Sequence, residues 1–253
     1  MSLLRTALGA GRDLVLVHGW GTHGGIWSDL ADGLALRFRV HVVDLPGCGE
    51  SADCTPYSLD HVATMLARDM PPRCGVVGWS LGGQIALAWA RKAPSQVERV
   101  ALIATNPCFT RREDWPHAVS GDVLQEFGRA LAADCLGTLQ RFFSLQALGD
   151  ERTREVAVRL RACLEQGGAP SPAALTGGLG ILLEADQRAE LAAISQPVLV
   201  LHGERDRIAP LAAAEHLGRS LANAELVVIP GAAHAPFVTS LPEVSAHLTR
   251  FFQ

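Results

Sequence analysis

A chain of 253 residues with 48% hydrophobic and 19% charged residues can bury the core of one large α/β domain, which excludes a disordered or collagen-like chain. The formal charge of −4 argues against non-specific nucleic-acid binding, which needs a basic surface. No apolar run reaches the ~18 residues of a membrane span, and Met1–Ala10 lacks the pattern of a cleavable signal peptide, so we expect a cytoplasmic protein.

Short β-branched runs alternate with segments of helical periodicity along most of the chain. Runs that are apolar on both faces suit the middle of a parallel sheet covered by helices, so this order predicts a doubly wound α/β sheet. The predicted strands are Leu14–Val17, Val40–Val43, Val76–Val77, Val100–Ala104, Val198–Leu201 and Leu226–Ile229. The predicted helices are Ile26–Leu36, Leu59–Asp69, Gln84–Arg91, Leu211–Ser220 and Pro242–Phe252.

The stretch from Pro107 to Asp186 breaks this alternation. It contains no strand pattern, and about 80 residues is too long for an ordinary connection. We therefore expect a core made of residues 1–106 and 187–253, with residues 107–186 inserted as a helical lid. The helical patterns of this stretch are Val123–Ala133, Leu136–Leu148, Thr153–Gln166 and Pro172–Leu183.

The cysteines give no sign of a disulfide framework or a zinc site. No two of them form a CxxC pair, and no cluster of histidine and cysteine has zinc-ligand spacing. We expect reduced, mostly buried thiols and no bound metal. The six residues are Cys48, Cys54, Cys74, Cys108, Cys135 and Cys163.

The strongest motif is a G-x-S-x-G sequence, Gly78-Trp79-Ser80-Leu81-Gly82. It follows a predicted strand and opens a predicted helix, which is the context of a nucleophile elbow. In such an elbow the serine lies on a strained turn that projects its hydroxyl, and the glycines prevent a collision between strand and helix. The alternative is a glycine-rich turn with an incidental serine, but the strand–turn–helix context favours Ser80 as a nucleophile.

A serine nucleophile needs a histidine base and an acid that orients the histidine, and after such an elbow the chain order is serine, acid, histidine. His234 lies just after the last predicted strand, in the small-residue loop Gly231–Phe237, and Asp206 lies in the loop after the preceding strand. Both loops are expected at the carboxyl ends of the strands, where open α/β sheets bind ligands. We predict Asp206 as the acid and His234 as the base.

Other acids and histidines have weaker contexts. Glu204 is close to Asp206, but the G-x-x-D spacing before Ile-x-Pro favours Asp206. Asp186, at the end of the long helical stretch, is expected to cap a helix or face solvent, and His202 to be structural. The remaining histidines have no motif around them: His23, His41, His61, His117, His216 and His247.

A second motif, His18-Gly19-Trp20-Gly21, follows the first predicted strand. The negative oxygen of a tetrahedral intermediate must face two backbone N–H groups, one after the nucleophile and one from an early loop. We assign these to Leu81 and Trp20, and expect His18 to hold the loop by hydrogen bonds. The glycine-rich loop Asp44–Ser51 matches no complete phosphate-binding pattern, so we expect no nucleotide and no cofactor.

Together these motifs resemble the α/β-hydrolase superfamily over essentially the whole chain, with abbreviated first strands. A narrower resemblance is to the pimeloyl-[acyl-carrier protein] methyl ester esterases of biotin synthesis. It is carried by HGWG, VDLPGCGES, GWSLGG and Gly177–Leu179, and its most discriminating parts are the lid entry, Asn106–Phe109 with Asp114–Pro116, and the AAHAPF loop.

The narrower resemblance implies a serine carboxylesterase that removes the methyl group from a pimeloyl chain held by acyl-carrier protein, releasing methanol. It implies an acyl channel in the lid and arginines on the lid surface that meet the acidic carrier protein, here Arg141 and Arg154, whereas two further matching positions hold Gly137 and Val158. We expect no nucleic-acid partner, no membrane association and a monomer. The implied substrate-binding residues are Trp20, Ser80, Leu81, Phe142, Phe143, Ser144, Leu145, Gln146 and His234.

The residues alone leave alternatives open. The helical pattern from Glu151 to Glu165 has an apolar stripe edged by arginines, which fits either carrier docking or an ordinary solvated face. Phe142 and Phe143 fit either a channel or a lid core. A general short-chain esterase, a carbon–carbon bond hydrolase of the same fold and a non-catalytic lidded receptor also remain possible, whereas Ser80 excludes the hydrolases that need an aspartate nucleophile.

Overall fold

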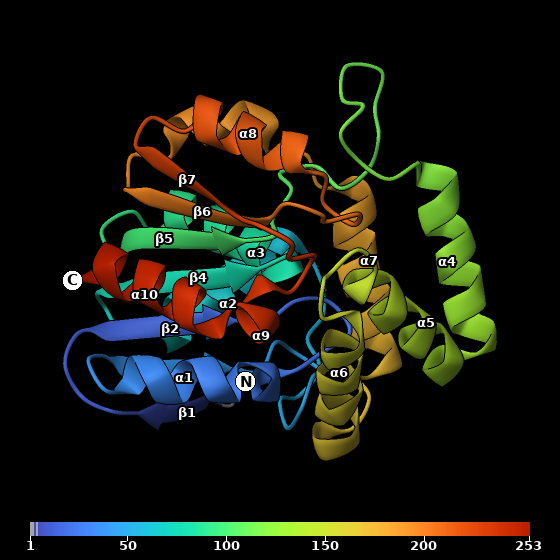
Figure 1. The fold of residues 1–253 in the computed structure, drawn as a ribbon, viewed down its shortest axis with the longest axis horizontal. Coiled ribbons are helices and arrows are strands. Elements are labelled where there is room, and N and C mark those ends of the chain that lie inside the picture. Colours follow the sequence, from blue (N-terminus) through green and yellow to red (C-terminus); the bar gives the residue numbers. More distant parts are fainter. Residues whose placement is uncertain (1–2, 4) are drawn as a thin grey trace.

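The computed structural model describes residue 3 and residues 5–253, so Met1, Ser2 and Leu4 of the N-terminal segment lie outside the described residues. In the described part of the chain, one sheet of seven strands forms the centre of the molecule (Figure 1). Its order is β1-β3-β2-β4-β5-β6-β7, and neighbouring strands are parallel except for β1 with β3. The strands are β1 Arg5–Leu8, β2 Asp13–Val17, β3 Arg39–Val43, β4 Cys74–Trp79, β5 Val97–Ile103, β6 Val198–Gly203 and β7 Ala224–Ile229.

The predicted α/β sheet is confirmed, and each of the six predicted strands has its counterpart in β2 to β7. The edge strand β1 is an addition to the prediction. Its four residues pair only with β3, and an edge strand of this length carries too short a pattern to be recognised from periodicity.

Alternate residues of the central strands face opposite layers of helices. In β2, Val15 and Val17 pack in one buried cluster, which includes residues of α2, α3 and α8. Leu14 and Leu16 point to the other face and pack in a cluster that includes residues of α1 and α10. The period of two along a strand therefore gives the sheet two apolar faces, which explains its continuous apolar runs. The helices of these layers are α1 Ser28–Ala35, α2 Leu59–Asp69, α3 Leu81–Lys92, α8 Leu211–Ser220 and α10 Leu241–Phe252.

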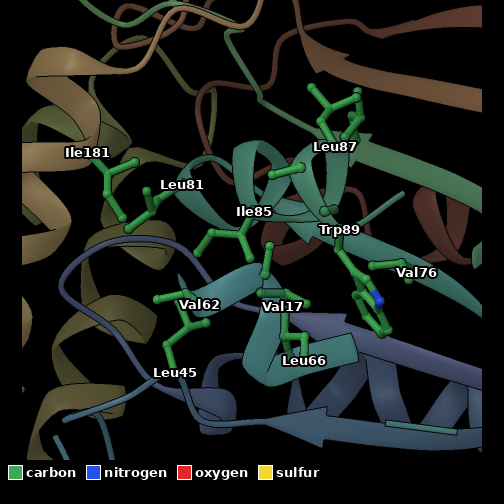
Figure 2. Close-up of a cluster of buried hydrophobic side chains, with 14 of the residues drawn as sticks. Val17, Leu45, Val62, Leu66, Val76, Leu81, Ile85, Leu87, Trp89 and Ile181 are labelled. Carbon is green, nitrogen blue, oxygen red and sulfur yellow. The ribbon is translucent and has the colours of Figure 1, made fainter. Parts of the chain in front are cut away.

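Helix α3 lies at the centre of the first of these layers. Figure 2 shows Ile85 and Trp89 of α3 among side chains of the sheet and of α2, with Val17, Val62 and Leu66 nearby. Ile85 and Trp89 are fully buried, and burial of an isoleucine side chain stabilises the fold by about 1.5–3 kcal/mol. The apolar contacts of α3 therefore hold its first turn, which follows Ser80, firmly against the sheet.

Helices α4 to α7 form an insertion between β5 and β6, and they gather at one end of the sheet (Figure 1). Each predicted helix of this stretch is found within about two residues of its predicted ends. Asp134 caps α5 by accepting a hydrogen bond from the N–H of Gly137 at 2.9 Å, and Ser171 caps α7, which has Pro172 in its first turn. The insertion contains α4 Gly121–Ala133, α5 Cys135–Ala147, α6 Thr153–Gly167 and α7 Pro172–Glu184.

The short helices of the chain connect these layers. Two are 3₁₀ helices, and one is a single α-helical turn after β7. They are η1 Gly24–Trp27, η2 Arg188–Ala193 and α9 Pro236–Thr239.

All six cysteines are free, and four of them are buried, in agreement with the expected reduced thiols. Burial raises the pKa of the Cys74 thiol to about 12, which keeps this side chain protonated and unreactive. Among the described residues, no helix has both the length and the apolar character that crossing a membrane requires.

Candidate active site

Ser80 lies on a strained turn between β4 and α3. Its φ of 55° and ψ of −116° fall outside the regions that residues with a side chain ordinarily adopt. The turn is held by the N–H of Ser80, which donates to the carbonyl oxygen of Ile103 in β5 at 2.9 Å. The backbone conformation is the one expected for a nucleophile elbow, with the serine held by the sheet at the start of a helix.

The glycines of the motif are required by close packing around this turn. A Cβ atom on Gly78 would lie 2.4 Å from the carbonyl oxygen of Gly82, and one on Gly82 would lie 2.3 Å from the carbonyl oxygen of Val17. A Cβ on Gly83 would lie 1.9 Å from the hydroxyl of Thr105. Because these neighbours are mostly backbone, a side chain at Gly78 or Gly82 would force strand and helix apart.

The structure brings Ser80, His234 and Asp206 together although they are far apart in sequence. Nε2 of His234 is 3.0 Å from Oγ of Ser80, and Nδ1 of His234 is 2.7 Å from Oδ2 of Asp206. The two contacts fix the tautomer: Nδ1–H donates to the carboxylate, and Nε2 accepts from the serine hydroxyl. His234 is fully buried, so its ring has few other partners available.

Asp206 is held as a carboxylate by the groups around it. Burial alone would raise its pKa, but the neighbouring His234, the nearby His202 and backbone hydrogen bonds lower the pKa below its ordinary value. Its second oxygen accepts hydrogen bonds from the N–H groups of Ile208 and Ala209 at 2.8 and 2.9 Å. One oxygen is thus fixed by the loop, which leaves the other directed at His234.

Glu204, the alternative acid, is directed elsewhere. Its carboxylate accepts a hydrogen bond from the N–H of Gly231 at 3.0 Å, and half of its side chain is exposed. Asp186 makes ion pairs with Arg188 at 2.7 Å and Arg112 at 3.4 Å. His202 donates from Nε2 to the carbonyl oxygen of Ala209 at 2.7 Å and so helps to fix the loop that carries Asp206.

Two backbone N–H groups near Ser80 are unengaged. In the described part of the chain, the N–H groups of Trp20 and Leu81 donate to no protein acceptor. Leu81 is the first residue of α3, where the N–H groups of the first turn have no helical partner and carry the positive end of the helix dipole. Both groups are therefore able to receive a negatively charged oxygen.

His18 fixes the loop that carries Trp20. Its Nδ1 is 2.8 Å from the carbonyl oxygen of Gly19, and its Nε2 is 2.9 Å from the N–H of Leu45, so the neutral ring donates through Nδ1 and accepts through Nε2. Burial lowers the pKa of His18 to about 4, which keeps the ring in this neutral form. The expected structural role of His18 is confirmed by these contacts.

An apolar cavity opens beside Ser80, beneath the insertion. Its space, including open solvent at the mouth, is about 660 Å³. Among the described residues that line it, Ser80 has the only hydroxyl and none has a charged side chain. The lining consists of Trp20, Ser80, Phe109, Val119, Val123, Leu124, Phe127, Phe142, Leu145, Leu179, Leu182 and Ile208.

Trp20 joins the core loop to the insertion. Its indole N–H donates to the carbonyl oxygen of Leu175 in α7 at 3.0 Å. Its ring packs edge-on against Phe127 of α4 and Phe142 of α5, with centroid distances of 5.4 and 5.2 Å. The indole is therefore a wall of the cavity as well as a packed side chain.

The implied substrate-binding residues of α5, Phe142–Gln146, do not all line the cavity. Phe142 and Leu145 line the cavity. Phe143 is fully buried in the cluster that faces α1 and α10, and Ser144 is exposed, with its hydroxyl donating to the carbonyl oxygen of Gln140 at 3.0 Å. Gln146 is buried, and its carbonyl oxygen accepts from the N–H of His234 at 3.3 Å.

Leu81 and the two predicted carrier-contact arginines lie outside the lining. The Leu81 side chain is buried beside Ile181 of α7 (Figure 2). Arg141 is exposed and donates to the hydroxyl of Thr138 at 2.7 Å, with Asp134 at 3.6 Å. Arg154 is exposed as well, and it forms no ion pair within the described residues.

Sequence reasoning assigned no site role to most of the cavity wall. Val123, Leu124 and Phe127 come from α4, in which Leu131 is the one residue classed as buried among those described. The spacing of these three residues on an amphipathic helix was the available signal. Ile208 lies two residues after Asp206. Leu179 and Leu182 lie on α7, where the apolar residues surround the helix and periodicity cannot distinguish a cavity face from a core face.

The sequence matches the α/β hydrolase fold family over residues 14–241. It is 46% identical over 235 residues to the pimeloyl-[acyl-carrier protein] methyl ester esterase of Nitrosomonas europaea, covering 93% of each chain. It is 43% identical over 239 residues to the protein of the same name from Chromobacterium violaceum, covering 94% of this chain and 93% of that one.

Solved structures agree with the fold. An esterase from Exiguobacterium antarcticum superposes with a TM-score of 0.89 at 22% identity, covering 99% of this chain and 95% of that one. A thermophilic esterase from Thermogutta terrifontis, with malate bound, superposes with a TM-score of 0.84 at 26% identity, covering 98% of this chain and 92% of that one.

Proposed function

The chain belongs to the α/β hydrolase fold family, and on this basis we propose that it is a serine carboxylesterase that hydrolyses the methyl ester of pimeloyl-[acyl-carrier protein] in biotin synthesis. The observation that carries the reaction class is the hydrogen-bonded series Ser80–His234–Asp206 beside an apolar cavity. The names of the relatives, at 46% and 43% identity over nearly the whole chain, support the substrate.

In the first half of the reaction, Ser80 Oγ attacks the ester carbonyl carbon as its proton passes to His234 Nε2. The carboxylate of Asp206 stabilises the imidazolium through Nδ1–H. The carbonyl oxygen becomes an oxyanion, which the N–H groups of Trp20 and Leu81 receive. His234 then returns the proton to the methoxy oxygen, the bond between this oxygen and the carbonyl carbon breaks, and methanol leaves.

In the second half, water attacks the acyl-enzyme as His234 Nε2 takes one of its protons. A second oxyanion forms at the same two N–H groups. Collapse of this intermediate breaks the bond to Ser80, which regains a proton from His234. The product is a free carboxylate at the end of the chain that remains attached to the carrier protein.

The insertion supplies the binding site in this proposal, with residues 107–186 acting as a lid on a core of residues 1–106 and 187–253. A neutral methyl ester can enter a cavity without charged lining groups, whereas a carboxylate would lose its hydration there without a partner. The same property favours release of the product. The exposed arginines Arg141 and Arg154 are proposed to meet the acidic carrier protein. The cytoplasmic location and the monomeric state stay predictions.

The decisive experiment is mass spectrometry of methyl-pimeloyl carrier protein after incubation with the enzyme. We expect the carrier-bound chain to lose the mass of one methylene group, and Ser80→Ala to leave it unchanged. Hydrolysis of a p-nitrophenyl ester without demethylation of the carrier substrate would instead indicate a general short-chain esterase. Absence of both activities would favour a non-catalytic receptor.

A further inference from the structure

The turn between α5 and α6 contacts the loop that carries His234. Asp150 lies in this turn and is buried. One of its carboxylate oxygens, Oδ1, accepts a local hydrogen bond from the N–H of Arg152 at 2.8 Å. The other, Oδ2, accepts from the N–H of Ala233 at 2.9 Å and from the hydroxyl of Thr239 at 3.2 Å. The carboxylate thus divides its oxygens between its own turn and the histidine loop.

Further contacts between the same two segments surround Asp150. The N–H of His234 donates to the carbonyl oxygen of Gln146 at 3.3 Å, and the N–H of Glu151 donates to the carbonyl oxygen of Gly231 at 3.0 Å. The N–H groups of two successive residues, 233 and 234, are therefore both bound by the α5–α6 segment. Helix α9, which carries Thr239, packs against α6 on the same side of the molecule (Figure 1).

The histidine loop is held on its other side by the sheet. The indole N–H of Trp79, next to Ser80, donates to the carbonyl oxygen of His234 at 2.8 Å. The peptide of His234 is therefore held between Trp79 and the α5–α6 segment. On the insertion side, Asp150 holds the histidine loop with a carboxylate, and Arg152 of the same turn donates from its guanidinium to the carbonyl oxygen of Thr239 at 2.6 Å. Charge-assisted hydrogen bonds are stronger than those between neutral groups.

We propose that Asp150 is a positioning residue for catalysis, which keeps the backbone of His234 at the place where its Nε2 meets Ser80. The proposal rests on the proposed function, since it takes His234 as the base. A general base must be held within about 0.5 Å of its productive place, and a misplacement of about 1 Å can reduce the rate by about a hundredfold. Asp150 also makes the lid part of the catalytic support rather than only a cover.

Asparagine separates the two roles of the carboxylate. An Asp150→Asn side chain keeps one acceptor oxygen, which can serve the N–H of Arg152, but it then presents an NH₂ group to the N–H of Ala233. If the amide turns over, the local bond is lost instead. In either orientation one of the two bonds has no acceptor, while the size of the side chain and the fold of the turn are preserved.

Asp134 provides a control at the other end of α5, since it precedes this helix and Asp150 follows it. Its carboxylate caps the start of α5 through the N–H of Gly137, at the opposite end from Asp150, and none of its recorded contacts involves the histidine loop. Asp134→Asn makes the same chemical change and keeps a good capping residue. A general effect of losing a carboxylate on α5 would appear in both variants.

The experiment compares kcat and KM for a p-nitrophenyl ester in the full-length wild type, Asp150→Asn and Asp134→Asn. We expect Asp150→Asn to lower kcat about tenfold with KM within about twofold, because the cavity lining is untouched, and Asp134→Asn to match the wild type. The proton NMR signal of His234 Nδ1–H should also shift or broaden in Asp150→Asn alone.

The proposal is overturned if the folded variants Asp150→Asn and Asp150→Ala both keep kcat within about twofold of the wild type, because alanine removes the acceptor for the N–H of Ala233 whichever way the asparagine amide turns. It is also overturned if only KM changes, or if Asp134→Asn loses as much activity. If Asp150→Asn does not fold, Thr239→Val is the test, because it removes the hydroxyl that donates to Oδ2 of Asp150. A lower kcat at constant KM then supports the proposal, and an unchanged kcat overturns it. Failure of the proposed function is distinct, because the wild type would then be no more active than Ser80→Ala.

Discussion

The loops at the carboxyl ends of β4, β6 and β7 differ from the helical insertion in how they are built. In the loops, backbone hydrogen bonds hold Ser80, Asp206 and His234, and all three are buried. In the insertion, large apolar side chains face solvent, with Val123 59% and Leu136 57% exposed. The sheet thus fixes the proposed reacting groups through its backbone, whereas the insertion forms the proposed binding surface from side chains.

This difference predicts two classes of variant. Changes at the ends of the strands should abolish the reaction for every substrate and leave the fold unchanged. Changes on the insertion should alter which substrates are used, with effects that are much smaller. Asp150 is the exception, since it belongs to the insertion in sequence and to the strand-end loops in its contacts.

The largest effect is expected from Ser80→Ala. Removal of the nucleophile in a comparable serine triad lowers kcat about a million-fold. The alanine keeps the Cβ atom and the strained backbone conformation, so the thermal midpoint should stay within a few degrees of the wild type. Steady-state kinetics on a p-nitrophenyl ester and a melting curve test both statements, and retention of more than about one-tenth of the activity would refute the assignment.

Asp206→Asn should follow, with a loss of about 10⁴-fold in kcat, because an amide favours the wrong tautomer of His234. Glu204→Gln is the control two residues away and should change kcat less than about threefold, since Glu204 contacts the N–H of Gly231 rather than the imidazole. The same kinetic assay compares them. A crippled Glu204→Gln beside a mild Asp206→Asn would show that the acid is misassigned.

The contrast between the two regions also explains what could be predicted from the sequence. Ser80 follows β4, and Asp206 and His234 follow β6 and β7. Parallel strands place their carboxyl ends along one edge of the sheet, so topology alone brings the three loops together. The ends of α2 and α8 agree with the prediction because neighbouring residues define them locally, such as the capping Ser58 before α2 and Pro210 before α8.

The cavity wall could not be predicted in the same way. Phe142 and Phe143 are adjacent, yet Phe142 lines the cavity and Phe143 lies in the buried core. Which of them faces the cavity depends on how α5 is rotated against α4 and α6, and this rotation is set by long-range packing. No sequence motif marks Asp150 either, because its partners Ala233 and Thr239 are more than 80 residues away along the chain.

A smaller effect, on stability rather than rate, is expected from His18. Its pKa is about 4 in the folded chain and near 6.5 when unfolded, so below pH 6.5 the unfolded chain binds a proton that the folded chain does not. The stabilisation is therefore complete above pH 6.5 and is lost as the pH falls towards 4, by about 2 kcal/mol between pH 7 and pH 5.

Urea unfolding of the wild type and of His18→Asn at a series of pH values checks this expectation. Other groups titrate in both proteins, so the informative quantity is the difference between the two curves. The free energy of unfolding should fall more steeply with decreasing pH in the wild type. Parallel curves would mean that His18 changes protonation in the same way in both states.

The smallest effect, and the most selective, is expected from reversing the charges of Arg141 and Arg154 to glutamate. If an acidic carrier protein docks on α5 and α6, its attraction acts mainly through the encounter rate, so KM for the carrier-bound ester should rise several-fold at low salt. The rise should shrink as salt is added, because exposed charges are screened over about 8–10 Å.

Arg154 should contribute more than Arg141, whose charge lies 3.6 Å from Asp134. Arg111→Glu with Arg129→Glu makes the same change of net charge on parts of the insertion other than α5 and α6, and it should leave KM unaltered. Hydrolysis of a small p-nitrophenyl ester should be the same in all of these proteins. Equal loss on both substrates would mean that the arginines support the lid, and no loss on either would make α5 and α6 an ordinary solvated surface.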